Sequence, residues 1–264
     1  MDTTVAKAFS VLEVLARSDV PLGVTDLAQR LELGKSNVHR LLQTLLALGY
    51  AKKTDGTGYV ATLRMWELGC NIVSNLALRD VARPYMRQLS NLTNEAVHLS
   101  ELQGSDVIYI DKIESKEPVR AYTQLGGRAA ANCAATGKII LAYLPADDVR
   151  EIFRNVIQVT PNTIMDVVQF FDQSAISRKR RYALNGGEWR ADVNGLASPI
   201  ANQNGKVFAG IGISAPASRL DVAEIEKYAP HLIEAGRKIS LELGCSKKNW
   251  DQLTELSTDL VGQV

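Results

Sequence analysis

The order of predicted elements in the first 61 residues constrains the fold of this chain more than any other feature. Apolar residues recur at helical spacing over residues 5–17, 25–33 and 35–49. A tight turn at Leu33-Gly34 joins the second and third stretches. Two short β-prone runs, 50–53 and 59–61, then flank Asp55-Gly56, a dipeptide typical of hairpins. Three helices followed by a hairpin are the order of a winged helix-turn-helix.

Local signals set the expected ends and faces of these helices. We expect the first helix to bury one stripe: Val5, Ala8, Phe9, Leu12, Leu15 and Ala16. Thr25 is expected to cap the second helix, and Gly34 to end it. Gly49 is expected to stop the third helix as a left-handed cap.

The polar face of the third helix predicts DNA binding. A helix fits the major groove of DNA, where its N-terminal residues reach base edges. Arg40 suits a guanine edge or a phosphate, and lysines on the hairpin suit phosphates. Any one of these charges, taken alone, is as well explained by a solvated surface. The expected DNA contacts, to double-stranded DNA, are Thr25, Lys35, Ser36, Asn37, His39, Arg40, Gln43, Thr44, Lys52 and Lys53.

Composition bounds the class of protein. The 264 residues are 46% hydrophobic and 22% charged, which is ordinary for a globular chain and excludes disorder and coiled coils. The net charge is +1, so DNA binding requires a local basic surface. Three well-separated cysteines without a CxxC suit a reducing cytoplasm. There is no apolar run of ~18 residues, so neither a membrane span nor a membrane partner is expected.

The rest of the chain predicts a second, α+β domain with a mostly antiparallel sheet. We expect a winged helix-turn-helix over 1–62, a linker helix over 63–79, the second domain over 80–246 and an unassigned tail over 247–264. The alternative for 63–79 is an ordinary helix of the second domain. The expected elements are helices over 79–93, 139–144, 146–155, 166–184 and 220–243, and strands over 95–102, 106–113, 118–125, 194–202 and 206–214. Pro84 is tolerable only in the first turn of its helix.

The chain resembles the IclR family of bacterial transcription regulators in four segments and in their order. These segments are LELGKSNVHRLLQTLLALGY (31–50), RPYMRQLSNLTNEAVHLS (83–100), AATGKIILAYLP (134–145) and GKVFAGIGISAP (205–216). The resemblance implies a winged-helix domain, a linker helix and a GAF-like effector-binding domain. It also implies dimers, or tetramers built from two dimers, on a palindromic operator. Members control catabolic operons in response to small organic acids, often aromatic ones, by repression or activation. No cofactor is implied.

Small residues over 129–137 suggest where an effector would bind. Ala135, Thr136 and Gly137 would present backbone N–H groups before a helix over 138–144, a favourable place for an anion. Ser214 adds a hydroxyl, Trp189 an aromatic wall, and Arg128 either clamps a carboxylate or points to solvent. The resemblance adds Ala121, Thr123, Ala129, Asn194, Gly195 and Gly212 to the pocket wall. The alternative for the small residues is close packing of helix on sheet.

The sequence leaves two alternatives to a ligand-responsive regulator. In one, the second domain only oligomerises; in another, the chain is an enzyme with an accessory helix-turn-helix. Glu95-x-x-His98 resembles half of a metal site, but it falls in a strand and has no second copy. Cys133 lacks the flanking signature of a nucleophile. RKRRY (178–182) is either a patch that binds phosphate or DNA or, as we expect, a solvated helix face. We therefore expect no catalytic and no metal site.

Overall fold

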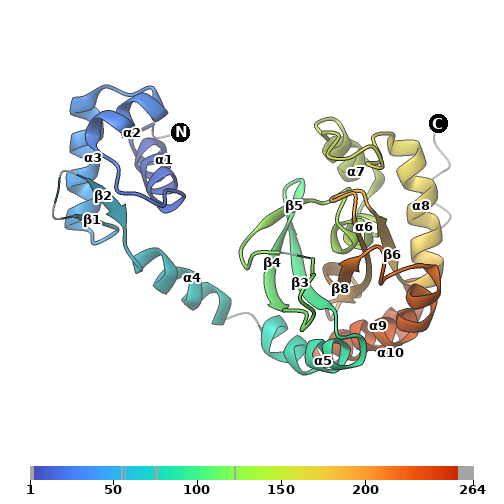
Figure 1. Cartoon of the computed structure of the whole chain (residues 1–264). Helices are drawn as coiled ribbons and strands as arrows, with labels where there is room; N and C mark the ends of the chain where they lie inside the picture. Colours follow the sequence, from blue (N-terminus) through green and yellow to red (C-terminus); the bar gives the residue numbers. More distant parts are fainter. Residues whose placement is uncertain (1–2, 55, 57, 75–76, 122, 255–264) are drawn as a thin grey trace. The chain divides into compact units, whose positions relative to one another are not determined.

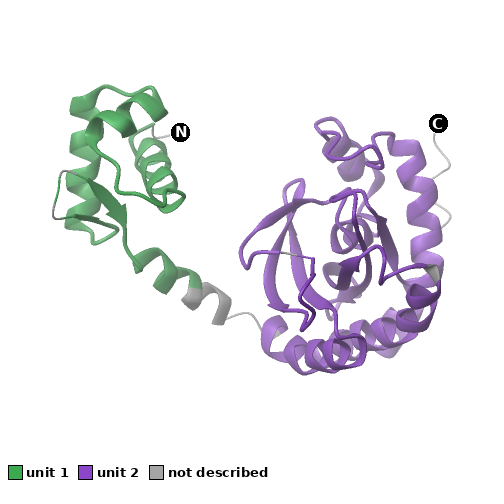
Figure 2. Cartoon of the chain, in the orientation of Figure 1, with its two compact units in different colours: residues 1–75 green, residues 76–264 purple. Residues whose placement is uncertain are grey.

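The computed structural model describes residues 3–54, 56, 58–74, 77–121 and 123–254. The chain divides into two units, Met1–Asn75 and Leu76–Val264, which are coloured separately in Figure 2. The boundary therefore falls inside the segment that was expected to form a linker helix. No helix in the described part of the chain is both long enough and apolar enough to cross a membrane.

The first unit is a winged helix-turn-helix. Its elements are α1 (Thr3–Ala16), α2 (Val24–Leu31), α3 (Lys35–Ala47), β1 (Ala51–Lys53), β2 (Tyr59–Ala61) and α4 (Arg64–Ser74) (Figure 1). The strands pair antiparallel, and Leu22 exchanges two backbone hydrogen bonds with Tyr59, which ties the hairpin to the segment between α1 and α2. Gly49 has a φ of 77°, so it ends α3 as predicted. Asp55 of the expected turn lies outside the described residues.

Three expectations for these helices are wrong. Val5 and Phe9 are 53% and 55% exposed, so the buried stripe of α1 is narrower than its apolar pattern. The cap of α2 is Gly23 rather than Thr25, because Asp26 accepts a hydrogen bond from the Gly23 N–H at 2.9 Å. Thr25 is exposed in the first turn of α2, and Gly34 begins α3 instead of ending α2.

The expected helix over 63–79 is two helices. α4 ends at Ser74, and residues 77–79 belong to α5 (Ala77–Thr93) of the second unit. Pro84 lies inside α5, well beyond its first turn, contrary to the expectation. The buried carboxylate of Asp111 holds this helix on the sheet, since Arg83 contacts it at 2.6 and 2.8 Å. Packing and this ion pair offset the backbone hydrogen bond that the proline removes.

The second unit is one six-stranded antiparallel sheet with helices on both faces. The strands are β3 (Ala96–Gln103), β4 (Asp106–Ile113), β5 (Arg128–Ala130), β6 (Ala183–Gly186), β7 (Val193–Ala201) and β8 (Val207–Pro216), in the order β5-β4-β3-β8-β7-β6. α5 and α9 (Val222–Glu242) pack on one face; α6 (Ala135–Leu141), α7 (Ala146–Phe153), α8 (Val167–Arg180) and α10 (Lys247–Gln252) pack on the other. Side chains along β7 alternate between the two faces: Leu196 and Ile200 face α5 and α9, whereas Ala197 and Ala201 face the α6 side of the sheet.

The expected strand over 118–125 is absent among its described residues. Thr123 is held by side chains instead: its carbonyl accepts from Lys112 Nζ, and its hydroxyl lies 3.2 Å from His98 Nδ1. β5, rather than this segment, pairs with the edge of β4, along residues Asp106–Ile108 of β4. Residues 183–184, expected at the end of a helix, begin β6.

The segment left as a tail completes the second core. Trp250 of α10 is fully buried in the same cluster as Ile139 and Phe170. Ser246 caps α10 by accepting from the Asn249 N–H at 3.0 Å. The second domain therefore extends past residue 246, to Leu253 at least.

Candidate effector pocket and nucleic-acid interface

α3 presents the expected polar face. Val38, Leu41, Leu42 and Leu45 are buried, whereas Lys35, Ser36, His39, Arg40, Gln43 and Thr44 are exposed and Asn37 is half-buried. Within the described part of unit 1, no carboxylate pairs with Lys35 or Arg40. The polar side chains of α3 therefore form one solvent-exposed face of the helix.

The two ends of this polar face suit phosphates. Gly34 at the N-cap offers no side-chain hydrogen bond to the first turn of α3, so backbone N–H groups stay available for an anion. On the hairpin, Ala51 is buried while Lys52 and Lys53 are exposed. Thr25 is exposed on α2. All of the predicted DNA contacts thus have side chains that solvent reaches.

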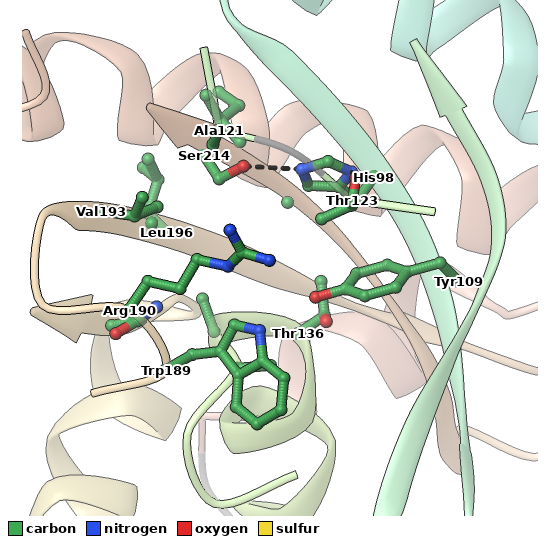
Figure 3. Close-up of a pocket in the computed structure, with 16 residues that line it drawn as sticks. His98, Tyr109, Ala121, Thr123, Thr136, Trp189, Arg190, Val193, Leu196 and Ser214 are labelled. Carbon is green, nitrogen blue, oxygen red and sulfur yellow. Dashed lines mark hydrogen bonds between the residues drawn. The ribbon is translucent and has the colours of Figure 1, made fainter. Parts of the chain in front are cut away.

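A pocket lies between the sheet and α6 in the second unit (Figure 3). Strands β3, β4, β7 and β8 supply one wall, the N-terminal turn of α6 another, and the turn between β6 and β7 a third. Of the predicted residues, Ala121, Thr123, Ala135, Thr136, Trp189, Gly195, Gly212 and Ser214 line it. Gly212 allows close approach, because a Cβ there would stand 2.9 Å from Thr136 Cγ2.

Four predicted residues lie outside this pocket, each with another role. Arg128 donates to Asp106 Oδ2 at 3.0 Å, and Asn194 donates to the Leu220 carbonyl at 2.9 Å. Ala129 is buried in the core. Gly137 provides the close packing that was the alternative interpretation, since a Cβ there would meet the Ala131 carbonyl at 2.3 Å. Ala135–Gly137 also form the first turn of α6, so the helix starts three residues earlier than expected.

Sequence reasoning missed several pocket residues, of which His98, Tyr109 and Arg190 carry the chemistry. His98 Nε2 lies 2.6 Å from Ser214 Oγ, and its Nδ1 faces Thr123. Burial lowers the pKa of His98 to about 4, with the nearby Lys112 charge acting in the same direction. The imidazole is therefore neutral at physiological pH, and one ring nitrogen donates while the other accepts.

Arg190 supplies the positive charge of the pocket. Its guanidinium points into the pocket, between Ser214 and Tyr109 (Figure 3). Burial raises the pKa of Tyr109 to about 12, and the Arg190 charge opposes that rise. Within the described residues Arg190 has no carboxylate partner. An unpaired guanidinium beside neutral hydroxyl and imidazole groups suits a carboxylate ligand.

A buried network fixes the turn that carries Trp189 and Arg190. Lys138 Nζ donates to Glu188 Oε1 and Oε2 at 2.6 and 2.7 Å, and both side chains are nearly inaccessible. Desolvation raises the pKa of Glu188 and lowers that of Lys138. Thr160 and Thr163 donate to the Glu188 carbonyl at 3.2 and 2.9 Å. The turn is therefore tied both to α6 and to the loop after α7.

The residues that could indicate an enzyme have structural roles. Glu95 pairs with Arg219 through two contacts, and His98 belongs to the pocket, so the two do not form half of a metal site. The described residues contain no cluster of His, Cys, Asp and Glu able to hold a metal. Burial raises the pKa of Cys133 to about 11, which keeps its thiol protonated. Arg178 is buried and donates to the Ala142 carbonyl, so RKRRY is not wholly a solvated face.

Comparisons with known proteins agree along the chain. The family described as IclR helix-turn-helix domain matches residues 4–55, and the family described as bacterial transcriptional regulator IclR C-terminal matches residues 70–241. The HTH-type transcriptional regulator KdgR of Escherichia coli (strain K12) is 34% identical over 245 residues, covering 92% of this chain and 93% of that protein.

Solved structures show the same fold. The crystal structure of the Thermotoga maritima IclR has a TM-score of 0.76 and 28% identity, over 92% of this chain and all of that one. An IclR homolog from Microbacterium hydrocarbonoxydans, complexed with 4-hydroxybenzoate, has a TM-score of 0.80 and 23% identity, over 91% and 99% of the two chains. The two family matches and the similarity to KdgR show that the chain belongs to the IclR family of bacterial DNA-binding transcriptional regulators.

Proposed function

We propose that this regulator acts in the cytoplasm and binds a roughly palindromic operator as a homodimer or as a dimer of dimers. Large apolar side chains on the first unit support self-association: Val5, Phe9, Leu63 and Trp66 are 53%, 55%, 77% and 61% exposed. A symmetric dimer presents two copies of α3, so half-sites should lie about 34 Å apart or a multiple of that distance.

The effector in this proposal is a small organic acid that controls a catabolic operon. The observation that carries it is the guanidinium of Arg190, which points into the pocket without a carboxylate partner among the described residues. His98, Ser214, Thr123 and Thr136 add neutral hydrogen-bonding groups around it. The complex of an IclR homolog with 4-hydroxybenzoate supports an organic acid as the kind of ligand.

Regulation requires that the acid favour one arrangement of the dimer over another, since a ligand shifts an equilibrium only through differential affinity. The segment 63–79 joins the two units in sequence, and we propose it as the transmitter. A coupling free energy of ~1–3 kcal/mol would change operator affinity ~5–150-fold.

The test begins with an operator selected from random duplex DNA. Fluorescence anisotropy then measures its affinity for the full chain with acetate, hexanoate or 4-hydroxybenzoate present. At least one acid should shift the affinity, and Arg190→Ala should abolish the shift while leaving acid-free DNA binding unchanged. Acid binding that never alters DNA affinity would mean that the second unit only oligomerises. Turnover of an acid would instead support an enzyme.

A further inference from the structure

Trp189 forms a wall of two neighbouring cavities. The pocket that contains Arg190 has a volume of about 40 Å³, whereas small-molecule sites typically enclose ~300–1,000 Å³. A cleft of about 380 Å³, which Trp189 also lines, lies between β5 and the loop after α7. The pocket that contains Arg190, called the inner pocket below, has room for a carboxylate group and little more.

The cleft differs from the inner pocket in its charge. Its guanidinium, that of Arg128, is already paired with Asp106 at 3.0 Å and also donates to the Gln103 carbonyl at 3.0 Å. Ser105 and Asn155 contribute uncharged polar groups, and Ile157 contributes apolar surface. The positive charge available to an acid is therefore that of Arg190 in the inner pocket, and the cleft offers neutral hydrogen-bonding groups.

We propose that the effector site has two compartments separated by Trp189, and that the effector is a monocarboxylic acid with an uncharged, hydrogen-bonding tail. Its carboxylate occupies the inner pocket beside Arg190, its chain passes the indole of Trp189, and its tail lies in the cleft. This inference rests on the proposed acid site and adds the length and the tail chemistry of the ligand. The half-buried indole of Trp189 lines both cavities, so a ligand that spans them would contact it.

The first measurement is calorimetry on the full chain with four probes: acetate, hexanoate, 6-hydroxyhexanoate and adipate. Burial of the additional methylene groups predicts that 6-hydroxyhexanoate binds at least about tenfold more tightly than acetate. It should also bind more tightly than hexanoate, whose tail makes no hydrogen bond, and than adipate, whose second carboxylate finds no free cation in the cleft.

Two matched variants locate the tail. Ile157→Trp places a bulky side chain in the cleft, and Ile176→Trp makes the same change on α8, outside both cavities; the two positions are 71% and 57% exposed, so both variants should fold. Ile157→Trp should remove most of the advantage of 6-hydroxyhexanoate while leaving acetate binding unchanged. Ile176→Trp should change neither.

The outcomes separate this inference from the proposed function. If acetate binds as tightly as 6-hydroxyhexanoate, or if Ile157→Trp has no effect, the acid site stands and the two-compartment proposal is wrong. Tightest binding of adipate or of hexanoate would overturn the uncharged, hydrogen-bonding tail. If none of the four acids binds, or if Arg190→Ala leaves their binding unaltered, the acid site itself fails and the inference fails with it.

Discussion

Replacing Lys138 by methionine tests the buried network behind the effector pocket. Methionine keeps most of the side-chain volume but leaves the Glu188 carboxylate without its cation. Removing one partner of a buried ion pair costs ~3–5 kcal/mol, because the remaining charge stays desolvated. Typical domains have only ~5–15 kcal/mol of stability, so the loss would be a large share. Effector binding should weaken in parallel, since Glu188 precedes Trp189 and Arg190.

The pH dependence of this loss identifies its cause. Burial already raises the pKa of Glu188, and removing the Lys138 charge raises it further. An acid whose folded pKa exceeds its unfolded value binds extra protons in the folded state, so the variant gains stability as pH falls toward the unfolded pKa. The deficit relative to the original chain should therefore be largest near pH 8 and smaller near pH 5.

Urea unfolding of the full chain, monitored by tryptophan fluorescence, measures the loss of unfolding free energy. Trp189 and Trp250 report on the second unit. Arg154→Met is the matched control, because the Arg154–Glu151 pair is exposed on α7 and its loss should cost below about 1 kcal/mol. Lys138→Met combined with Glu188→Leu removes both charges and should recover most of the stability. Equal losses for Lys138→Met and Arg154→Met would refute the reasoning.

Three further predictions concern other parts of the chain. Arg40→Ala should cost ~1–3 kcal/mol of operator binding and relax specificity at one base, and wild-type affinity of this variant would contradict the place of Arg40 in the groove. Lys52→Ala should weaken binding to all DNA sequences similarly and make the affinity less dependent on salt concentration. Thr136→Leu should lower thermal stability by ~1–3 kcal/mol, because Gly212 already packs against Thr136; an unchanged melting temperature would show that the site has spare room. The pKa of His98 is depressed to about 4 on folding, so below pH 6.5 the unfolded chain binds a proton that the folded chain does not. The free energy of unfolding should therefore fall by up to about 3 kcal/mol as the pH drops from 6.5 to 4. Urea titrations at those pH values should show a shallower fall for His98→Gln.

Local sequence signals were sufficient to predict the first unit. The turn residues and apolar spacing around α3 lie close together in sequence, and Gly49 adopts the left-handed conformation that its position predicted. The misplaced cap of α2 is also a local matter, because Gly23 takes the cap position and Asp26, in the first turn, accepts a hydrogen bond from the Gly23 N–H. Phe9 was misassigned because apolar spacing alone cannot distinguish a buried side chain from an exposed apolar one.

The pocket could be predicted only in part because it is assembled from distant segments. Thr136 and Ser214 had signals of their own: a small-residue turn and a strand hydroxyl. Arg190 lies in an irregular turn without periodicity, and only the order of strands brings that turn opposite His98. Arg128 was the more obvious candidate in sequence, but its pairing with Asp106 depends on the register of β5 against β4. The segment around Thr123 has strand-like composition, yet tertiary hydrogen bonds from Lys112 determine its path.

The burial of Trp250 changes what a premature stop codon near the end of the gene would mean. A product that ends at residue 246 would lack a fully buried indole of the core that also contains Ile139 and Phe170, although every strand would still be encoded. Loss of a buried tryptophan costs ~3–5 kcal/mol, so such a product would behave as a core-destabilised protein and become a substrate for proteases. In a cell it would be scored as the loss of a regulator, while the recognition helix, encoded at the other end, remained chemically intact.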